Sequence, residues 1–423
     1  MRTTKGWIFL TLAWILLCMP SISASGYSVA PDRDAKVQTY LEAITREPGN
    51  AENHYLLGVR LSDLARDEEA IAALSKAIVL KPDSAKAYLA RGGAYRKQRQ
   101  FDAAMADYDT VIKLEPDWAK PYAGRGALFS TQGKYELAME EYARGIAINP
   151  DEAAIYRQRG LTYAKEGKYE LAIADYTKSI ELDPDYPYTY YNRGFVYAYL
   201  EQYDQAVADC GKFIELEPND ARGYDARGSV YFEQGQYVRA IADFAVAIEL
   251  NPDNAEYYND RGKAYALQAE YEQAIMDFTR AIAISPDYET AYINRGIIYD
   301  IQNQREMAIL DFTKAIALNP YSVRAYNHRG GAYFGQEEYE LAIADFTKAI
   351  EIRPDNLGAY RLRGMLYCNL EKYELAIDDY SKAIELDPNN AMLYIFRADV
   401  YETMGDKDAA AADRQKAEEL DGK

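Results

Sequence analysis

Few side chains in this sequence could perform catalysis or hold a metal. The only two histidines, His54 and His328, are far apart in the chain, so a histidine-based triad or zinc site is not expected. Three cysteines are too few for a disulfide framework, and Cys210 falls at an apolar helical position that suits a core residue better than a nucleophile. No glycine-rich phosphate loop follows a predicted strand. The sequence therefore predicts no catalytic residue, no metal site and no cofactor.

Charged and tyrosine side chains remain as candidates for binding. The chain has 67 acidic and 48 basic residues in 423, and a net charge of −19. This charge argues against a nucleic-acid-binding protein, because neutralising phosphates requires a basic surface. The 40 tyrosines greatly outnumber the 12 phenylalanines and 3 tryptophans. The question is therefore which elements position the tyrosines and the basic residues.

Prolines recur every 34 residues from Pro48 to Pro388, which divides the chain into eleven units that begin at residue 51. Within a unit, aromatic residues at positions 4 and 11 flank a glycine at position 8, the spacing of one helix face. Aromatic, alanine, bulky and small residues at positions 17, 20, 24 and 27 form a second face. Proline at position 32 ends the second helix, and aspartate at position 33 is placed to cap the next one. Such a period predicts a stack in which each unit buries its apolar face against its neighbours.

The pattern resembles the tetratricopeptide repeat family, as in Gly92, Tyr95 and Ala104 of the second unit. Tyrosine replaces the usual tryptophan at position 4, and arginine replaces leucine at position 7. The resemblance implies an all-α, right-handed superhelical solenoid of about eleven 34-residue helix-turn-helix repeats, in which the first helix of each pair lines a concave groove. It also implies an adaptor that holds peptides or partner proteins and is not an enzyme.

Residues 1–25 have the order of a secretory signal peptide: a basic start, an apolar run at 7–19 and then small residues. Cleavage is expected after Ser23 or Ser25. The alternatives are retention as an anchor or lipidation at Cys18. All three predict an exported chain, periplasmic or secreted after cleavage, with no membrane span in the mature part. The predicted domains are the signal peptide at 1–25, an N-terminal capping helix at 26–50, repeats 1–10 at 51–388, and repeat 11 with a C-terminal cap at 389–423.

Position 7 is arginine and position 23 is acidic in the same ten units. Unit one lacks both, since Leu57 and Ala73 occupy these positions. An arginine ladder is one way to bind phosphate groups. Because the two residue types are present together and absent together, we favour an ion pair within each unit over a ladder for a ligand.

Thirty of the 40 tyrosines fall at positions 4, 11, 17 and 24, where they belong to the scaffold. Four of the others, at 186, 188, 191 and 199, lie close together around unit five. In proteins that resemble this one, positions 2, 5, 9, 12 and 13 face the concave side. Units two to six place basic and aromatic residues there. We predict a peptide-binding site formed by Tyr188, Tyr191, Phe195, Tyr199, Phe232, Arg157, Lys165, Lys86, Arg96, Lys97 and Lys120. The alternative for the tyrosines is additional packing between repeats.

The predicted function is a non-enzymatic protein–protein interaction scaffold outside the cytoplasm, which binds a peptide or a segment of a partner protein in the concave groove. Basic and aromatic groups together suit an acidic peptide with an aromatic or apolar anchor. The alternative function is a structural spacer or adaptor in an envelope assembly, such as polysaccharide-export or outer-membrane machinery. No nucleic-acid partner is expected.

Overall fold

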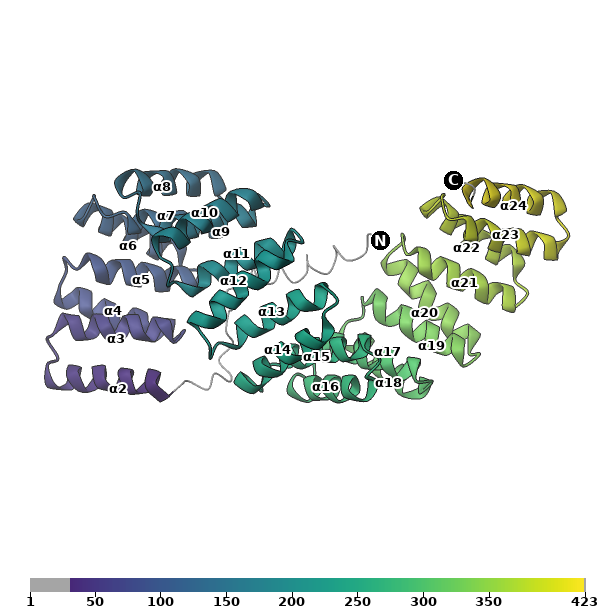
Figure 1. The fold of residues 1–423 in the computed structure, drawn as a ribbon, viewed down its shortest axis with the longest axis horizontal. Helices are drawn as coiled ribbons and strands as arrows, with labels where there is room; N and C mark the ends of the chain where they lie inside the picture. Colours follow the sequence, from purple (N-terminus) through teal and green to yellow (C-terminus); the bar gives the residue numbers. More distant parts are fainter. Residues whose placement is uncertain (1–30, 422–423) are drawn as a thin grey trace. The chain divides into compact units, whose positions relative to one another are not determined.

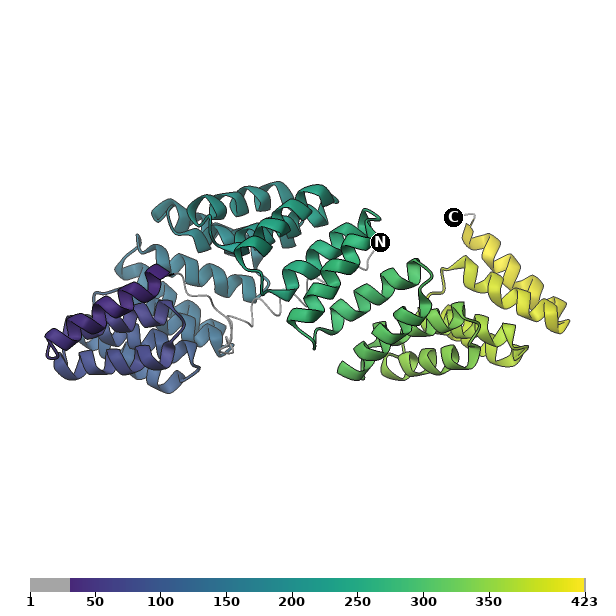
Figure 2. The same ribbon diagram turned by 90° about the horizontal axis from the view of Figure 1, so that it is seen from below.

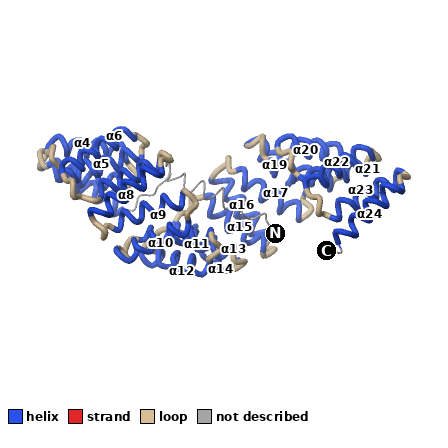
Figure 3. Tube along the Cα trace, turned by 90° about the horizontal axis from the view of Figure 1, so that it is seen from above, coloured by secondary structure: helices blue, strands red, loops and turns tan. Residues whose placement is uncertain are grey.

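The computed structural model describes residues 31–421, which form 23 helices and no strand (Figures 1 and 3). The all-α fold predicted from the 34-residue period is confirmed for this part of the chain. The leader predicted at residues 1–25 lies outside the described residues. No helix within 31–421 is both long enough and apolar enough to span a membrane.

The chain divides into two compact units, Met1–Val230 and Tyr231–Lys423, and the boundary falls inside α13 (Ala221–Glu233). The first unit begins with α2 (Pro31–Arg46). Five helix pairs follow it: α3 (Ala51–Asp63) with α4 (Asp67–Leu80), α5 (Ala85–Lys97) with α6 (Phe101–Leu114), α7 (Lys120–Thr131) with α8 (Tyr135–Ile148), α9 (Ala153–Lys165) with α10 (Tyr169–Leu182), and α11 (Pro187–Tyr199) with α12 (Tyr203–Leu216).

The second unit contains α14 (Tyr237–Leu250) and five further pairs. They are α15 (Ala255–Leu267) with α16 (Tyr271–Ile284), α17 (Glu289–Ile301) with α18 (Arg305–Leu318), α19 (Val323–Gly335) with α20 (Tyr339–Ile352), α21 (Leu357–Asn369) with α22 (Tyr373–Leu386), and α23 (Ala391–Met404) with α24 (Lys407–Asp421). Figure 2 shows the same paired helices from another side. Each pair corresponds to one 34-residue repeat.

The helix ends follow from local sequence, with one correction. Asparagine or serine at position 34 caps several first helices; the Asn50 and Asn254 side chains accept hydrogen bonds from the backbone N–H groups of Glu52 and Glu256. The prediction that aspartate at position 33 provides this cap is therefore wrong. That residue lies one position too early, because position 34 is the last residue with non-helical backbone angles, as Ser84 after Asp83 illustrates.

The turn inside each pair requires a left-handed residue. Gly133, Gly167 and Gly235 have φ of +74°, +75° and +73° there. Seven other repeats place a non-glycine residue in this conformation, for example Arg99 at φ 60° and Glu201 at φ 60°. Such residues are strained by roughly 1–2 kcal/mol each, so packing of the two helices must hold the turn.

Close packing of the two helices explains the glycine at position 8. A Cβ atom added at Gly92 would lie 2.8 Å from the ring of Tyr108, and one added at Gly262 would lie 2.8 Å from the ring of Phe278. The aromatic residue at position 24 therefore lies directly on the backbone of the first helix. The core of each repeat is built from this contact and from the alanine at position 20, such as Ala104, which is fully buried.

The first helices of neighbouring repeats also contact one another. In the first unit, α5 contacts α7, α7 contacts α9, and α9 contacts α11; in the second unit, α15 contacts α17 and α17 contacts α19. Because elements on the inner side of a curved stack lie closer together, the first helices form the concave side of each unit. The predicted site residues all belong to first helices, so the fold presents them from this inner layer.

Candidate peptide-binding surface

The arginine at position 7 forms an ion pair within its own repeat and belongs to the scaffold. Arg91 donates from Nε and Nη2 to the two carboxylate oxygens of Asp107, both at 2.8 Å, and equivalent ion pairs within one repeat are described for nine of the ten units. Most of these arginines also lie over the tyrosine rings at positions 4 and 11, at about 5.5–5.9 Å. The predicted structural pairing is confirmed, and these arginines are not a ladder for a ligand.

The same arginine also links neighbouring repeats, which the sequence analysis missed. The Nη1 atom of Arg91 donates to Ser75 Oγ of the preceding repeat at 2.9 Å. The equivalent acceptors in later repeats are Thr177, Thr279, Thr313, Thr347 and Ser381. The signal was available in the sequence as a recurring serine or threonine at position 25.

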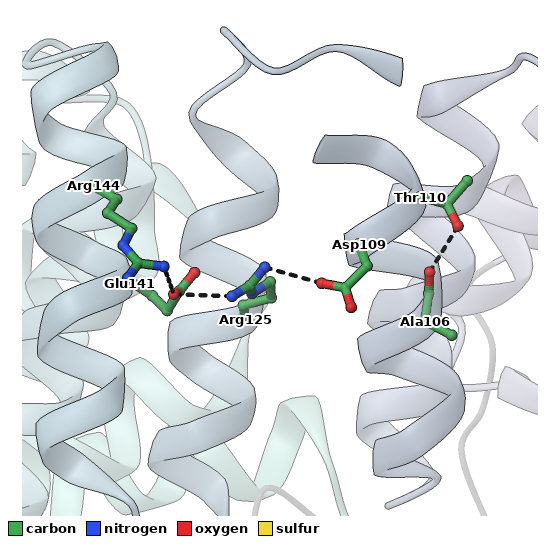
Figure 4. A network of polar contacts seen from close by, with 6 residues as sticks. All are labelled: Ala106, Asp109, Thr110, Arg125, Glu141 and Arg144. Atoms are coloured by element: carbon green, nitrogen blue, oxygen red, sulfur yellow. Dashed lines mark hydrogen bonds and ion pairs between the residues drawn. The ribbon is translucent and has the colours of Figure 1, made fainter. Parts of the chain in front are cut away.

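Repeat three uses carboxylates for the same link (Figure 4). Arg125 donates to Asp109 of the preceding repeat at 2.9 Å and to Glu141 of its own repeat at 3.0 Å. Arg144 adds a second donor to Glu141 at 2.8 Å. Each of these charged side chains has an oppositely charged partner, so the network stabilises the stack. The Arg125 Nε and Glu141 Oε2 atoms are buried and have no hydrogen-bond partner among the described residues.

Three predicted site residues of α11 form one cluster, which we call the aromatic shelf: Tyr188, Tyr191 and Phe195. The Tyr191 ring lies 4.8 Å from Phe195 and 5.2 Å from Phe213, and the Tyr188 ring lies 5.6 Å from Phe213. Phe213 is fully buried on α12, at position 27, where most repeats have a small residue. The shelf therefore rests on a core side chain that the sequence analysis did not single out.

One arginine contacts the aromatic shelf, and a second contacts Tyr186, whose ring lies 5.7 Å from that of Tyr188. The Arg222 Nη2 atom donates to the Tyr188 hydroxyl at 2.8 Å and to Asp220 at 2.6 Å. The guanidinium of Arg157 lies 3.7 Å from the centre of the Tyr186 ring, in cation–π contact. The Arg157 Nη1 atom is buried and has no hydrogen-bond partner among the described residues. Burial raises the pKa of Tyr188, so its hydroxyl stays protonated near neutral pH.

Tyr199 does not join the shelf. Its ring lies 4.4 Å from that of Tyr169 on α10, and burial together with the neighbouring Tyr199 hydroxyl raises the pKa of Tyr169 to about 12. Phe232 belongs to the second compact unit, where it lies 5.5 Å from the Tyr237 ring and 5.4 Å from the Lys263 ammonium.

The predicted basic residues separate into paired and unpaired groups. Lys97 donates to the backbone oxygen and the hydroxyl of Ser62, at 2.8 and 3.0 Å, and lies 3.6 Å from a carboxylate oxygen of Asp67. In contrast, Arg96 and Lys165 form no ion pair with any carboxylate in the described part of the chain, and neither does the exposed Lys120. Lys86 is likewise exposed at the start of α5.

Arg96 and Lys165 influence each other. Burial lowers the pKa of Lys165, and the positive charge of Arg96 lowers it further. The Nε atom of Arg96 is buried without a hydrogen-bond partner within residues 31–421, although the guanidinium lies beside the hydroxyl of the buried Tyr108. Two neighbouring cations without a counter-charge destabilise each other, so this place favours an external anion.

A hollow of about 170 Å³ adjoins Arg96, and we call it the cationic recess. Its polar lining is Arg96, Tyr108, Lys120 and Gln158; its small or apolar lining is Leu89, Ala123, Gly124, Ala127 and Ala154. These residues come from α5, α6, α7 and α9. The sequence analysis predicted Arg96 and Lys120 but missed Tyr108 and Gln158, because Tyr108 looks like an ordinary scaffold tyrosine at position 24.

Family models match the chain along most of its length. One model described as "TPR repeat" matches residues 63–98, 129–167, 160–200 and 228–269. Two models described as "Tetratricopeptide repeat" match 187–220, 323–356 and 358–390, and 85–117, 255–288, 289–322 and 392–423. No curated relative matches the chain.

Several solved structures are similar to this chain. The crystal structure of MamA is 25% identical over 38% of this chain and 94% of its own, with a TM-score of 0.37. That of YrrB, described as a TPR protein with an unusual peptide-binding site, is 26% identical over 44% and 95%, with a TM-score of 0.37. The APC/C hetero-tetramer Cut9-Hcn1 aligns over 99% of this chain and 94% of the matched chain at 14% identity, with a TM-score of 0.44.

The matches together cover well over half of the residues. Each match to the two models described as "Tetratricopeptide repeat" corresponds to one helix pair, as 187–220 does to α11 and α12. The chain belongs to the tetratricopeptide repeat family.

Proposed function

We propose that this protein is a non-enzymatic interaction scaffold that binds a peptide, or a segment of a partner protein, on the concave side of its first unit. A tetratricopeptide fold supports a role as a protein-interaction scaffold. The observation that carries the finer proposal is the pair Arg96 and Lys165, which lie together without a carboxylate partner in a chain of net charge −19. On such an acidic molecule, a local excess of positive charge selects acidic segments.

The aromatic shelf supplies the second half of the proposed site. Tyr188, Tyr191 and Phe195 are half-buried, so part of each ring remains accessible to a ligand. The rings of Tyr188 and Tyr191 also pack against the buried Phe213, which fixes their positions. Aromatic anchors fixed in this way contribute strongly to interfaces because they lose little conformational freedom on binding. The proposed ligand is therefore an acidic segment with an aromatic or apolar anchor residue.

We also propose that the protein acts outside the cytoplasm. This rests on the signal-like order of residues 1–25 and not on the described helices. N-terminal sequencing of the mature protein from fractionated cells tests it, and a mature chain that still begins at Met1 in the cytoplasmic fraction would contradict it.

Binding of random octapeptides to the full-length protein tests the proposed site. We expect enrichment of peptides that combine Asp or Glu with an aromatic or large apolar residue. Phe195→Ala should remove the preference for the anchor residue with little loss of thermal stability, because Phe195 is half-buried at the edge of the shelf. The matched control is Phe334→Ala in the second unit, a half-buried phenylalanine that also contacts one ring, that of Tyr339 at 6.0 Å.

Two results would contradict the proposal. One is the absence of any enriched peptide. The other is a decrease in binding for Phe195→Ala that is fully explained by a decrease in the fraction of folded protein. That result would mean that the aromatic shelf contributes to packing and not to binding. A structural spacer would instead bind through its ends, so dependence of partner binding on α24, for example on Arg414→Ala, would favour that alternative.

A further inference from the structure

We propose that Tyr169 and Tyr199 form a site of oxidative modification, where a one-electron oxidant joins the two rings into a dityrosine cross-link between the fourth and fifth repeats. The oxidant is of the class that a haem peroxidase forms from hydrogen peroxide. Neither tyrosine belongs to the aromatic shelf or lines the cationic recess, so this inference goes beyond the proposed function and does not depend on it.

The two rings meet because position 17 of one repeat lies beside position 13 of the next. Lys97, at position 13, lies 3.6 Å from the carboxylate of Asp67, at position 17 of the preceding repeat. A Cβ atom added at Gly335, at position 13, would collide with the side chain of Arg305, at position 17 of the repeat before it. Only the junction between repeats four and five has tyrosine at both of these positions.

The two phenols are arranged for coupling. Their ring centres lie 4.4 Å apart at an interplanar angle of 43°, and the hydroxyls of Tyr169 and Tyr199 are in hydrogen-bonding contact. A dityrosine bond joins the two ring carbons that lie next to the hydroxyl-bearing carbons. Because the hydroxyl ends of the rings lie together, these ortho carbons lie close together as well. Both side chains are only half-buried, so water and a small oxidant have access to them.

The coupling reaction is balanced by one molecule of hydrogen peroxide. Burial raises the pKa of Tyr169 to about 12, so this phenol is protonated near neutral pH and loses a proton together with its electron. Each phenol gives one electron to the oxidant and one proton to water, which leaves a phenoxyl radical. The two radicals form a C–C bond between ortho carbons, and transfer of the two ortho hydrogens to the ring oxygens restores both phenols. Hydrogen peroxide accepts the two electrons and two protons and becomes two water molecules.

The cross-link would stabilise a junction that contains two buried hydroxyl groups. Ser179 and Thr189, at positions 27 and 3 of repeats four and five, are fully buried, and their hydroxyl oxygens have no hydrogen-bond partner within residues 31–421. Such groups destabilise a packed interface, because they lose their bonds to water. Repeats nine and ten instead have the fully buried Ala349 and Ala359 at these positions. We therefore expect the junction between α10 and α11 to open more readily than that between α20 and α21, and the cross-link to hold it closed.

The test treats the full-length protein with a haem peroxidase and hydrogen peroxide, at a protein concentration low enough that separate chains do not join. The monomer is then isolated and digested with trypsin. We expect the main dityrosine product to join peptides 169–178 and 194–212, with a mass two hydrogen atoms below their sum. Both peptides contain further tyrosines, so fragmentation must place the bond at Tyr169 and Tyr199.

Three variants test the assignment. Tyr199→Phe should abolish this product, because a phenylalanine ring has no hydroxyl from which a phenoxyl radical can form. The matched control is Tyr339→Phe, which also changes position 17 but removes a tyrosine whose ring neighbour is Phe334, at 6.0 Å; it should leave the yield unchanged. Asn369→Tyr places a tyrosine at position 13 opposite Tyr339 and should create a second cross-link at that junction.

The outcomes that would overturn the proposal are distinct. One is a set of cross-links spread over many tyrosines, with a yield that Tyr199→Phe does not change. Another is a monomer whose tyrosines are oxidised to other products without any dityrosine. Once the cross-link has formed, amide hydrogen exchange in α10 and α11 should become slower relative to α20 and α21. Unchanged exchange in α10 and α11 would show that the cross-link does not stabilise the junction.

Discussion

At the scale of single residues, the arginine at position 7 shows how one side chain serves several contacts. In the second unit, Arg261 donates to both oxygens of Asp277 at 2.8 Å and lies 5.9 Å from the rings of Tyr258 and Tyr265. The exposed fractions of the two charged side chains are 21% and 7%. Because the pair is largely buried, its value for stability depends on both partners being present.

We predict that Arg261→Leu lowers the free energy of unfolding by about 2–4 kcal/mol, since Asp277 is then buried without its partner. The double variant Arg261→Leu with Asp277→Ala should recover much of this loss. It reproduces the pair Leu57 and Ala73, which is buried in the first repeat. Denaturant unfolding of the single and double variants measures the coupling energy.

The control for this cycle is Lys314→Leu, which changes an exposed lysine on α18 and should alter stability by less than about 0.5 kcal/mol. If the effects of Arg261→Leu and Asp277→Ala on the free energy of unfolding are additive, the coupling energy is zero and the ion pair does not stabilise the fold.

At the scale of helices, neighbouring repeats fit together by matching a residue at position 27 with one at position 3 of the next repeat. Gly145 of α8 faces Ile155 of α9: a Cβ atom at Gly145 would lie 2.7 Å from the Ile155 Cδ1 atom. The order is reversed two junctions later, where Phe213 of α12 faces Gly223 of α13: a Cβ atom at Gly223 would lie 2.6 Å from the Phe213 ring. At these two junctions a large residue on one helix is therefore matched by a glycine on the other.

We predict that Phe213→Ala costs about 3–5 kcal/mol, because it leaves a cavity where the side chain is fully buried. Gly223→Ile alone should cost at least about 1–3 kcal/mol through overpacking. The double variant should be more stable than the sum of the two changes predicts, since it restores the size pairing seen at Gly145 and Ile155. Chemical denaturation provides the three values, and strict additivity would contradict the matching.

This junction also connects the scaffold to the proposed site. Tyr188 and Tyr191 rest on Phe213, so Phe213→Ala should loosen the aromatic shelf as well as the core. Peptide binding measured on the folded fraction of this variant should therefore fall.

At the scale of the whole molecule, each helix within residues 31–421 contacts only helices that are close to it in the chain. In such a stack, stability is close to a sum of terms for single repeats and for neighbouring pairs, so damage stays local. Leu393 is fully buried at the start of α23, where it packs with Ala383 and Ile384.

We predict that Leu393→Ala, at a cost of about 2–5 kcal/mol, increases amide hydrogen exchange in α21–α24 and leaves α3–α8 unchanged. Exchange followed by mass spectrometry tests this repeat by repeat. A uniform increase along the chain would show that the molecule unfolds as one cooperative body.

The sequence alone determined the repeat, the helix pairs and the arginine–acid pairing. These features depend on spacing within 34 residues, and a helix converts such spacing directly into faces. Sequence also identified the concave candidates, although it assigned helix capping to position 33 when the backbone places it at position 34. The position of the cap depends on backbone angles at the last loop residue, which residue types alone do not specify.

Tertiary structure decided which candidates have partners. Lys97 and Lys165 occupy the same position in their repeats, yet Lys97 is bonded to Ser62 and Asp67, whereas Lys165 lies beside Arg96 with no carboxylate within the described residues. The physical reason is that such a side chain finds its partner on another helix, as Lys97 does at Ser62, 35 residues away in the chain. The local pattern specifies the face on which a side chain lies, but the neighbouring repeat determines whether that side chain is already paired or is available to a ligand.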